Sequence, residues 1–455
     1  IFTFRNDGPV KHRGHLIAAA LAGLLALAGG AAARIVAADD VRPAAVARPT
    51  VDAEDLDRRI ALVEARVRRD PFSATDRGWL AQLLLQRARE TGSAEDVPAA
   101  EAAARESLRL RGARNPAGHA LLASALVEQH RFGEALAEAR TLVALEPENA
   151  PFRALLGEIR LELGDYAGAD TVFASLAPSR AELDVAPRLA RWAEIRGRTG
   201  EARALLRAAR DRAVLRTDLP PELVAWFQLR VGDFELRHGE LDAAEEALAA
   251  GLEVFPDDRR LLAAMARLEG ARENWDAAID FGERAVAAAP EPATLALLSD
   301  LYAASGRAER AAEYARVVEV SLAGSAGAYH RAESLFLLDH GRRVPQVLAQ
   351  ARADLRTRRD VYGHDLLAWA LHRSGRDAEA REAMAAALAP GTRDPMLLYH
   401  AGMIEKSLGD RERSREHLRA ALGIAPEFHP VHARLAREAL ACQAPLRRFL
   451  AGDCD

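Results

Sequence analysis

The chain has few cysteines, few aromatic residues and almost no lysine. Of its 455 residues two are cysteines and 5% are aromatic, and Lys11 and Lys406 are the only lysines. The two cysteines lack the C-x-x-C spacing of a metal site. The formal net charge of −5 argues against a nucleic-acid scaffold, because such proteins carry an excess of basic residues.

The sequence also lacks the motifs of common enzymes. It contains no G-x-x-x-x-G-K-[ST] phosphate loop, no H-E-x-x-H zinc helix, no G-x-S-x-G elbow and no G-x-G-x-x-G after a strand. No legible nucleophile, acid/base pair or cofactor loop remains, so we predict a non-enzymatic protein without a cofactor. No segment alternates with period two for long enough to predict a strand, and the chain is expected to be all-α.

A pattern of glycine, a large residue and alanine recurs along the chain. The interval from Ala244 to Ala278 is about 34 residues, and so is the interval from Pro256 to Pro290. A period of this length belongs to stacked helix pairs. Within each copy, apolar residues recur at helical spacing, as in Leu121, Leu122, Ala125 and Leu126.

These copies resemble tetratricopeptide (TPR) repeats. The unit from Ala150 carries Leu156, Gly157, Gly164, Tyr166, Ala169, Phe173 and Leu176 at the positions that the family favours. Further units begin near Asp76, Pro116, Leu183, Ala225, Arg259, Pro292, Gly327, Val361 and Pro395. The resemblance covers roughly residues 70 to 430 and implies an α-solenoid of about nine to ten helix-turn-helix repeats in a right-handed superhelix.

Small residues and prolines occupy positions where this architecture needs them. We expect Gly at the eighth position, as in Gly157, to lie where two helices cross too closely for a larger side chain. Gly at the fifteenth position, as in Gly164, suits the left-handed turn that ends a first helix. Pro256, Pro290 and Pro426 fall where a second helix must stop.

The amino terminus resembles an export signal. Lys11 and Arg13 precede an apolar run from Leu16 to Ala28, and small residues in A-x-A spacing follow it. We predict a secretory signal peptide, with an uncleaved membrane anchor and a buried helix as alternatives. Either of the first two places the repeats in the periplasm or on a membrane facing it, with membrane contact only through this segment.

The predicted organisation has four parts. Residues 1–38 are the signal peptide or anchor, 39–56 a Pro/Ala linker, 57–434 the TPR solenoid and 435–455 a C-terminal tail. In an exported protein Cys442 and Cys454 could close a disulfide in that tail, and two unpaired thiols are the alternative. Residues 322–328 are either a hinge between two subarrays or a longer loop.

Histidines near the C-terminus supply the only metal hypothesis. His429 and His432 lie three residues apart, with His417 one helix earlier. Pro430 separates the pair and no acidic or thiol ligand is near in sequence, so packing or capping is the favoured interpretation.

The binding surface is predicted from the resemblance. In such repeats the first helix lines a concave groove, mainly at its second, fifth, ninth, twelfth and thirteenth positions. Aromatic residues and Arg are typical of binding surfaces, although packing between repeats is the alternative for Trp226 and Trp369. The predicted groove residues are Trp226, Asp233, Arg237, Arg267, Asp300, Tyr362, Asp365, Trp369, His372, Arg373, Tyr399, Met403 and Lys406.

Two function classes follow from these patterns. The first is a protein-protein interaction scaffold that holds a protein or peptide partner in the groove, in the bacterial cell envelope, with self-association also open. The second is an accessory protein for metal or small-molecule handling that uses the C-terminal histidines. A groove that clamps chaperone tails needs Lys and Asn, of which the chain has few.

Overall fold

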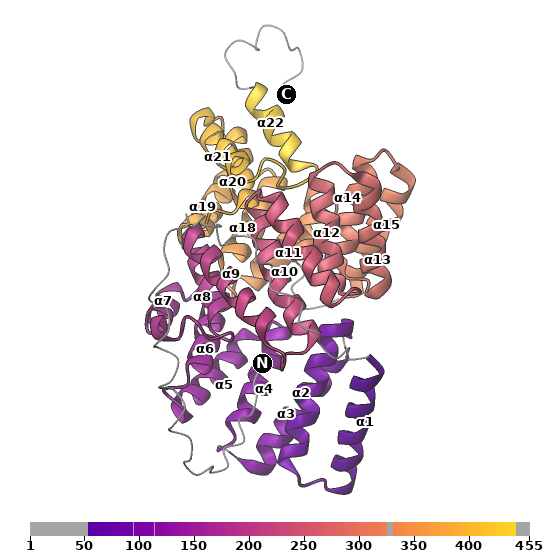
Figure 1. The fold of residues 1–455 in the computed structure, drawn as a ribbon. Coiled ribbons are helices and arrows are strands. Elements are labelled where there is room, and N and C mark those ends of the chain that lie inside the picture. Colours follow the sequence, from indigo (N-terminus) through magenta and orange to yellow (C-terminus); the bar gives the residue numbers. More distant parts are fainter. Residues whose placement is uncertain (1–52, 94, 113, 325–330, 443–455) are drawn as a thin grey trace, which may run out of the picture. The chain divides into compact units, whose positions relative to one another are not determined.

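The computed structural model describes residues 53–93, 95–112, 114–324 and 331–442. For residues 53–54 and 321–324 it describes the backbone alone. Within the described ranges the chain forms 22 α-helices and no strand (Figure 1). The all-α prediction is therefore confirmed for this part of the chain.

Helices α2 to α21 form helix-turn-helix pairs, so the α-solenoid prediction is confirmed. In each pair the first helix also contacts the first helix of a neighbouring pair, as α10 does with α12 and α18 with α20. The pairs are α2 (Ala74–Thr91) with α3 (Asp96–Arg111), α4 (Pro116–Glu128) with α5 (Phe132–Leu145), α6 (Ala150–Glu162) with α7 (Tyr166–Ala174), α8 (Ala186–Ile195) with α9 (Thr199–Leu215), α10 (Pro221–Arg237) with α11 (Leu241–Val254), α12 (Arg259–Ala271) with α13 (Trp275–Ala288), α14 (Pro292–Ala304) with α15 (Ala308–Gly324), α16 (Arg331–Asp339) with α17 (Val344–Asp354), α18 (Val361–Arg373) with α19 (Asp377–Leu388), and α20 (Pro395–Ser407) with α21 (Arg411–Ile424).

Single helices flank these pairs. Helix α1 (Ala53–Arg69) precedes them and α22 (His432–Cys442) follows them, and a short 3₁₀ turn, η1 (Ala177–Ser179), lies between α7 and α8. Helix α22 crosses the boundary predicted at residue 435. Cys442 ends this helix, whereas Cys454 lies outside the described residues.

The first helices begin close to the predicted repeat starts. Six begin at the predicted residue itself: Pro116, Ala150, Arg259, Pro292, Val361 and Pro395. Helix α10 begins at Pro221, four residues before the predicted Ala225, because a proline is well suited to the first helical position. The predicted start at Gly327 lies outside the described residues.

Capping side chains fix several of these starts. Asp360 precedes α18, and its carboxylate accepts a hydrogen bond from the Gly363 amide at 2.8 Å. At the start of α6, the side-chain oxygen of Asn149 accepts a hydrogen bond from the Phe152 amide at 3.2 Å. Such caps satisfy amides that the first turn leaves without a partner. The local sequence therefore determines where a repeat begins.

Glycines at the eighth repeat position lie where paired helices cross. A Cβ built on Gly232 in α10 would lie 2.6 Å from the Leu248 side chain of α11, and Gly157 would meet the Phe173 ring at 2.7 Å. Real Cβ atoms do not approach so closely, so a larger residue would force the helices apart. The prediction for this position is confirmed.

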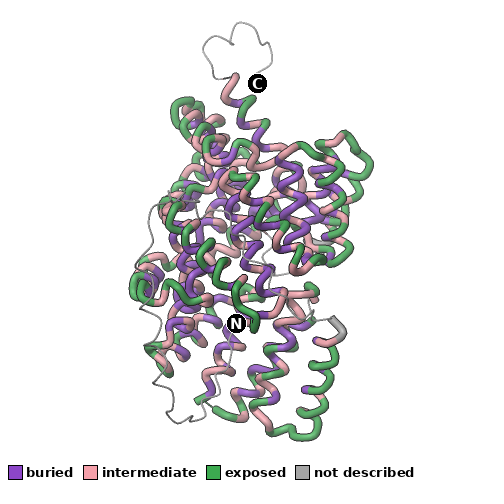
Figure 2. The backbone as a smooth tube through the Cα atoms, in the orientation of Figure 1, coloured by how far each residue is buried: buried purple, intermediate pink, exposed green. Residues whose placement is uncertain are grey.

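The core follows these crossings along the array. Figure 2 shows buried residues on the faces where helices meet and exposed residues on their outer sides. Alanine and leucine dominate the interior, with Phe173, Phe234 and Tyr399 among its largest members. Smaller clusters span adjacent pairs, as repeat stacking requires. The largest cluster instead joins residues of α6 to α11 with residues of α16 to α22, so distant parts of the array also pack together.

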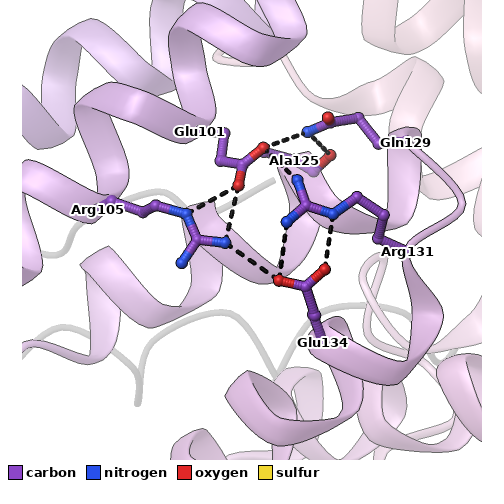
Figure 3. Close-up of polar contacts among 6 residues, drawn as sticks. All are labelled: Glu101, Arg105, Ala125, Gln129, Arg131 and Glu134. Carbon is purple, nitrogen blue, oxygen red and sulfur yellow. Dashed lines mark hydrogen bonds and ion pairs between the residues drawn. The ribbon is translucent and has the colours of Figure 1, made fainter.

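An ionic network joins the pair α2–α3 to the pair α4–α5. Arg131, just before α5, donates to Glu101 of α3 and to Glu134 of α5, each at 2.7 Å (Figure 3). Arg105 donates to Glu101 at 2.8 Å, and the Gln129 amide donates to the same carboxylate. Burial alone would raise the pKa of Glu101, but these donors lower it. The network holds the α4–α5 turn against α3.

The predicted signal or anchor lies outside the described residues. Most of the predicted linker 39–56 does too, but residues 53–56 belong to α1, so its predicted end is wrong. Residues 325–328 of the predicted hinge also lie outside the described residues. Among the residues that the structure describes, no helix combines the length and hydrophobicity needed to cross a bilayer.

Candidate functional site: the face of the first helices

Charged side chains on successive first helices pair with one another. Glu158 of α6 accepts a hydrogen bond from Arg188 of α8 at 2.7 Å, and Asp233 of α10 accepts one from Arg267 of α12 at the same distance. These pairs join neighbouring repeats rather than residues of one helix. We call the residues of this set the charged face: Glu158, Glu162, Arg188, Arg191, Glu194, Asp233, Arg237 and Arg267.

The predicted groove residues Asp233, Arg237 and Arg267 belong to this face. Arg237 pairs with Glu194 of α8 and with Asp233, the latter at 3.1 Å. Burial raises the pKa of Asp233, but Arg267 and Arg237 outweigh that effect and hold it well below its ordinary value. The three residues therefore keep their charges at neutral pH and fix one another's positions.

Arg230 lies next to the charged face but is not one of its paired residues. It lies one turn before Asp233 on α10, yet it takes part in none of the ion pairs found among the described residues, and its Nε is buried without a hydrogen-bond partner. Its guanidinium lies 5.9 Å from the Trp226 ring. Burial lowers the pKa of Arg230, Asp233 opposes this, and Arg237 adds to the lowering. An unpaired guanidinium beside an aromatic ring suits an anionic partner group.

Two aromatic groove residues lie at this face without being fully buried. Trp226 packs edge-on against Phe227, with ring centroids 5.0 Å apart. Tyr362 of α18 lies under the Arg331 guanidinium at 5.1 Å. Burial and then Asp394 raise the pKa of Tyr362 to about 12, so its hydroxyl stays a neutral donor. Both rings remain partly accessible.

The predicted groove residues Asp365, Trp369 and Tyr399 are buried instead. The Asp365 carboxylate contacts His400 Nδ1 at 2.7 Å and also pairs with Arg331. Trp369 stacks on His400 at 4.2 Å. Trp369 and Tyr399 are each only 2% exposed, so the packing alternative describes Trp369, and neither ring offers a partner free surface.

A cluster of rings surrounds these residues. Trp369 donates its indole N–H to Asp339 of α16 at 2.7 Å, and Tyr399 stacks on His432 of α22 with centroids 4.7 Å apart. His432 is nearly parallel to His429, with centroids 4.2 Å apart. We call this set the ring cluster: Trp369, Tyr399, His400, His429 and His432.

Asp300 connects α14 to the ring cluster. Its carboxylate lies 3.0 Å from His340 Nε2 and 3.7 Å from His429 Nε2. Despite these histidines, no group of three or more His, Cys, Asp or Glu residues in the described ranges has the geometry to hold a metal ion. The metal hypothesis thus gains no support from His429 and His432.

The remaining predicted residues lie at the edge of this region. His372 contacts Asp377 at 2.6 Å, and burial lowers its pKa. Arg373 is exposed, with its guanidinium 6.0 Å from the Trp369 ring. Met403 and Lys406 of α20 are partly buried. A binding role for any of these residues stays a prediction.

Sequence reasoning missed several members of the charged face. Arg188, Arg191 and Glu194 lie on α8, whose repeat is one of the weaker copies. Arg230 was missed because it occupies none of the groove positions that the resemblance supplied. Opposite charges separated by about one repeat, as in Asp233 and Arg267, were the available signal.

Protein-family models match three segments of the chain. Models of the tetratricopeptide repeat match residues 126–191, 225–268 and 397–428. The chain contains tetratricopeptide repeats. The matched TPR segments include Glu158, Arg188 and Arg191 in the first and Arg230, Asp233 and Arg237 in the second. No curated protein sequence matches the chain.

The solved structures that resemble the chain share low sequence identity with it. A tetratricopeptide repeat protein of Parabacteroides merdae is 16% identical, with a TM-score of 0.40, and the match covers 54% of this chain and 91% of that one. Pseudomonas aeruginosa pilF is 18% identical, with a TM-score of 0.37 and coverage of 47% and 93%. A human IFIT1 dimer with PPP-AAAA is 15% identical, with a TM-score of 0.43 and coverage of 82% and 95%.

Proposed function

We propose that the chain is a non-enzymatic scaffold that binds a protein partner on the charged face between α6 and α12. TPR repeats favour protein-protein interaction as a general role. The observation that supports this surface is Arg230, a guanidinium without an ion pair among the described residues, set beside Trp226 and an ordered array of charges.

The surface is preorganised for binding. Because Asp233 is held between Arg237 and Arg267, little side-chain freedom remains to be lost when a partner arrives. The guanidiniums alternate with carboxylates, which would repel a continuous phosphate backbone. A peptide with discrete acidic side chains can pair with Arg230 without meeting that repulsion. A protein or peptide partner therefore suits the face better than a nucleic acid.

Replacing Arg230 tests this surface. Proximity labelling in native cells identifies the partner, and its affinity for the purified chain is then measured by calorimetry. Arg230→Ala should weaken binding about 10-fold or more, because it removes a charged contact in a partly desolvated site. Arg109→Ala removes the same charge from the exposed Arg109–Glu106 pair and serves as the matched control. Equal affinities of the two variants would contradict the proposed surface.

The cellular location belongs to the same proposal. Lys11 and Arg13 before the apolar run support export or tethering in a bacterial envelope, with the repeats in the periplasm or on a membrane facing it. Fractionation of cells that express the full chain tests this. Recovery in the cytoplasm with the apolar run retained and no membrane association would refute the location, although the binding surface could still hold.

A further inference from the structure

The turn before α22 makes contacts across several repeats. His429 Nε2 lies 3.7 Å from Asp300 of α14, so the contact bridges the intervening pairs from α16 to α21. His432, the first residue of α22, lies 3.5 Å from Asp339 of α16. A helix that only capped the last pair would need contacts with α20 and α21 alone.

These contacts cover residues that the repeat pattern assigns to the binding groove. The His432 ring stacks on Tyr399 with centroids 4.7 Å apart, and the Phe428 ring lies 5.8 Å from Tyr399. Tyr399 is thereby buried, and Asp300 keeps only 13% of its side chain exposed. A partner can reach Tyr399 only after this segment moves.

We propose that residues 429–442, the turn at His429 together with α22, form a latch over the C-terminal end of the first-helix face, and that acidification releases it. The latch is an intramolecular contact and needs no partner. It therefore stands or falls independently of the binding surface proposed on α6 to α12.

The contacts of the latch include buried polar groups. His400 Nε2 and His432 Nδ1 are both buried without a hydrogen-bond partner among the described residues. Buried polar groups left unpaired cost free energy that alanine or leucine would not. The contact of the latch around His400 and His432 should therefore open more easily than the helix crossings formed by Ala and Leu.

Charged and titratable groups from each neighbouring element face His429. Helix α14 supplies Asp300, α16 supplies Asp339, α20 supplies His400, and the latch itself supplies His432. His340, the residue after α16, contacts the same Asp300 carboxylate. Arg373 of α18 lies at the edge, with a guanidinium nitrogen 3.5 Å from the Asp339 carbonyl. The carboxylates favour a protonated His429, and burial together with the other histidines opposes it.

Burial prevails at this position. It lowers the pKa of His429 to about 4, and neighbouring His432 adds to the effect against the attraction of Asp300 and Asp339. In the released segment the ordinary value of about 6.5 applies, so the open state binds more protons between pH 6.5 and pH 4. The contribution of His429 to closure is present above pH 6.5 and is lost as pH falls toward 4. By linkage, opening increases about 30-fold between pH 7.5 and pH 5.

Hydrogen exchange of the full chain tests the latch. Amide exchange of α22, corrected for intrinsic rates, is measured by mass spectrometry at pH 7.5 and pH 5, with α10 as an internal reference. We expect opening of α22 to rise about 30-fold in acid while α10 changes much less. Unchanged protection of α22 would overturn the proposal.

Variants separate titration from packing. His429→Gln removes the titrating group and should reduce the acid response of α22 to less than about 3-fold, because no proton is then taken up at this site. His417→Gln on neighbouring α21 is the control and should keep the full response. His429→Phe retains the ring stack on His432, so it reports on titration even if the Gln variant packs poorly. A full acid response in both His429 variants would assign the effect to another group and overturn the proposal.

Discussion

Gly164 lies against the main chain of Arg359, almost two hundred residues later in the sequence. A Cβ built on Gly164 would lie 2.6 Å from the Arg359 carbonyl carbon and closer still to its oxygen. Gly164 lies in the turn after α6 with φ of +76°, and Arg359 lies in the turn before α18. Gly375, at the same repeat position with φ of +72°, has no atom within 4 Å of its built Cβ. The fifteenth repeat position thus favours glycine at Gly375 for its left-handed backbone, and at Gly164 also for the close contact with the main chain of Arg359.

Replacing each glycine by alanine separates these purposes. Gly375→Ala should cost about 1 kcal/mol of unfolding free energy, the penalty of a left-handed residue. Gly164→Ala carries the same penalty and also pushes on a carbonyl that cannot rotate away, so we expect a further loss of about 2 kcal/mol or more. Urea unfolding followed by circular dichroism measures both. Equal losses would mean that the contact with Arg359 does not hold in solution.

Tyr166 strengthens the same long-range contact. Its hydroxyl accepts a hydrogen bond from the Val361 amide at 2.7 Å, and that amide belongs to the first turn of α18. Tyr166→Phe removes this acceptor from a buried donor and should lower the unfolding free energy by about 1 to 2 kcal/mol. Hydrogen exchange at the Val361 amide is the direct measurement. Tyr362→Phe on the same helix should leave that amide protected, and loss of protection there would count against the assignment.

The sequence predicted the repeats because each repeat is specified locally. Prolines, caps and the glycine at the crossing, such as Pro395, Asp394 and Gly402, lie within one unit and need no knowledge of distant segments. The contacts of Gly164 with Arg359 and of Asp300 with His429 depend on how small rotations between repeats accumulate along the array. A pattern within one repeat therefore does not predict which distant residues come into contact.

Sequence position predicted the location of some groove residues but not the burial of others. Position within a repeat correctly indicates which residues lie on the first helices, and Asp233 and Arg267 pair there at one repeat spacing. Burial of Trp369 and Tyr399 results from rings contributed by α20 and α22, which the repeat position does not reveal. A search for opposite charges one repeat apart would have found part of the charged face.

Glu273 occupies the glycine position of its repeat with φ of +60°. A side chain in this conformation is strained, whereas glycine adopts it freely. Glu273→Gly should therefore raise the unfolding free energy by about 0.5 kcal/mol. The substitution relieves the backbone strain, but glycine also has more conformational freedom in the unfolded chain, and this offsets part of the gain. Glu246→Gly, inside α11, should instead destabilise by about 1 kcal/mol. Thermal unfolding compares the two, and a destabilised Glu273→Gly variant would show that the turn does not need glycine.

Asp365 should give the chain a strong acid dependence. Its carboxylate is fully buried between His400 and Arg331. Burial raises the pKa of Asp365, but His400 and Arg331 more than compensate and lower it. Because the folded pKa lies below the unfolded value, this contribution to stability is present above about pH 4 and is lost as pH falls through the folded pKa.

Asp365→Asn makes that dependence measurable. The substitution removes the negative charge from the buried contacts of Asp365 with Arg331 and His400, and should cost about 3 kcal/mol of unfolding free energy at pH 7. The difference from the wild-type chain should shrink as pH falls below about 4, because the wild-type carboxylate then becomes neutral as well. Asp377→Asn, at the more accessible pair with His372, should cost no more than about 1 kcal/mol. Urea unfolding at several pH values measures both, and a pH-independent difference for Asp365→Asn would show that charge is not what this residue contributes.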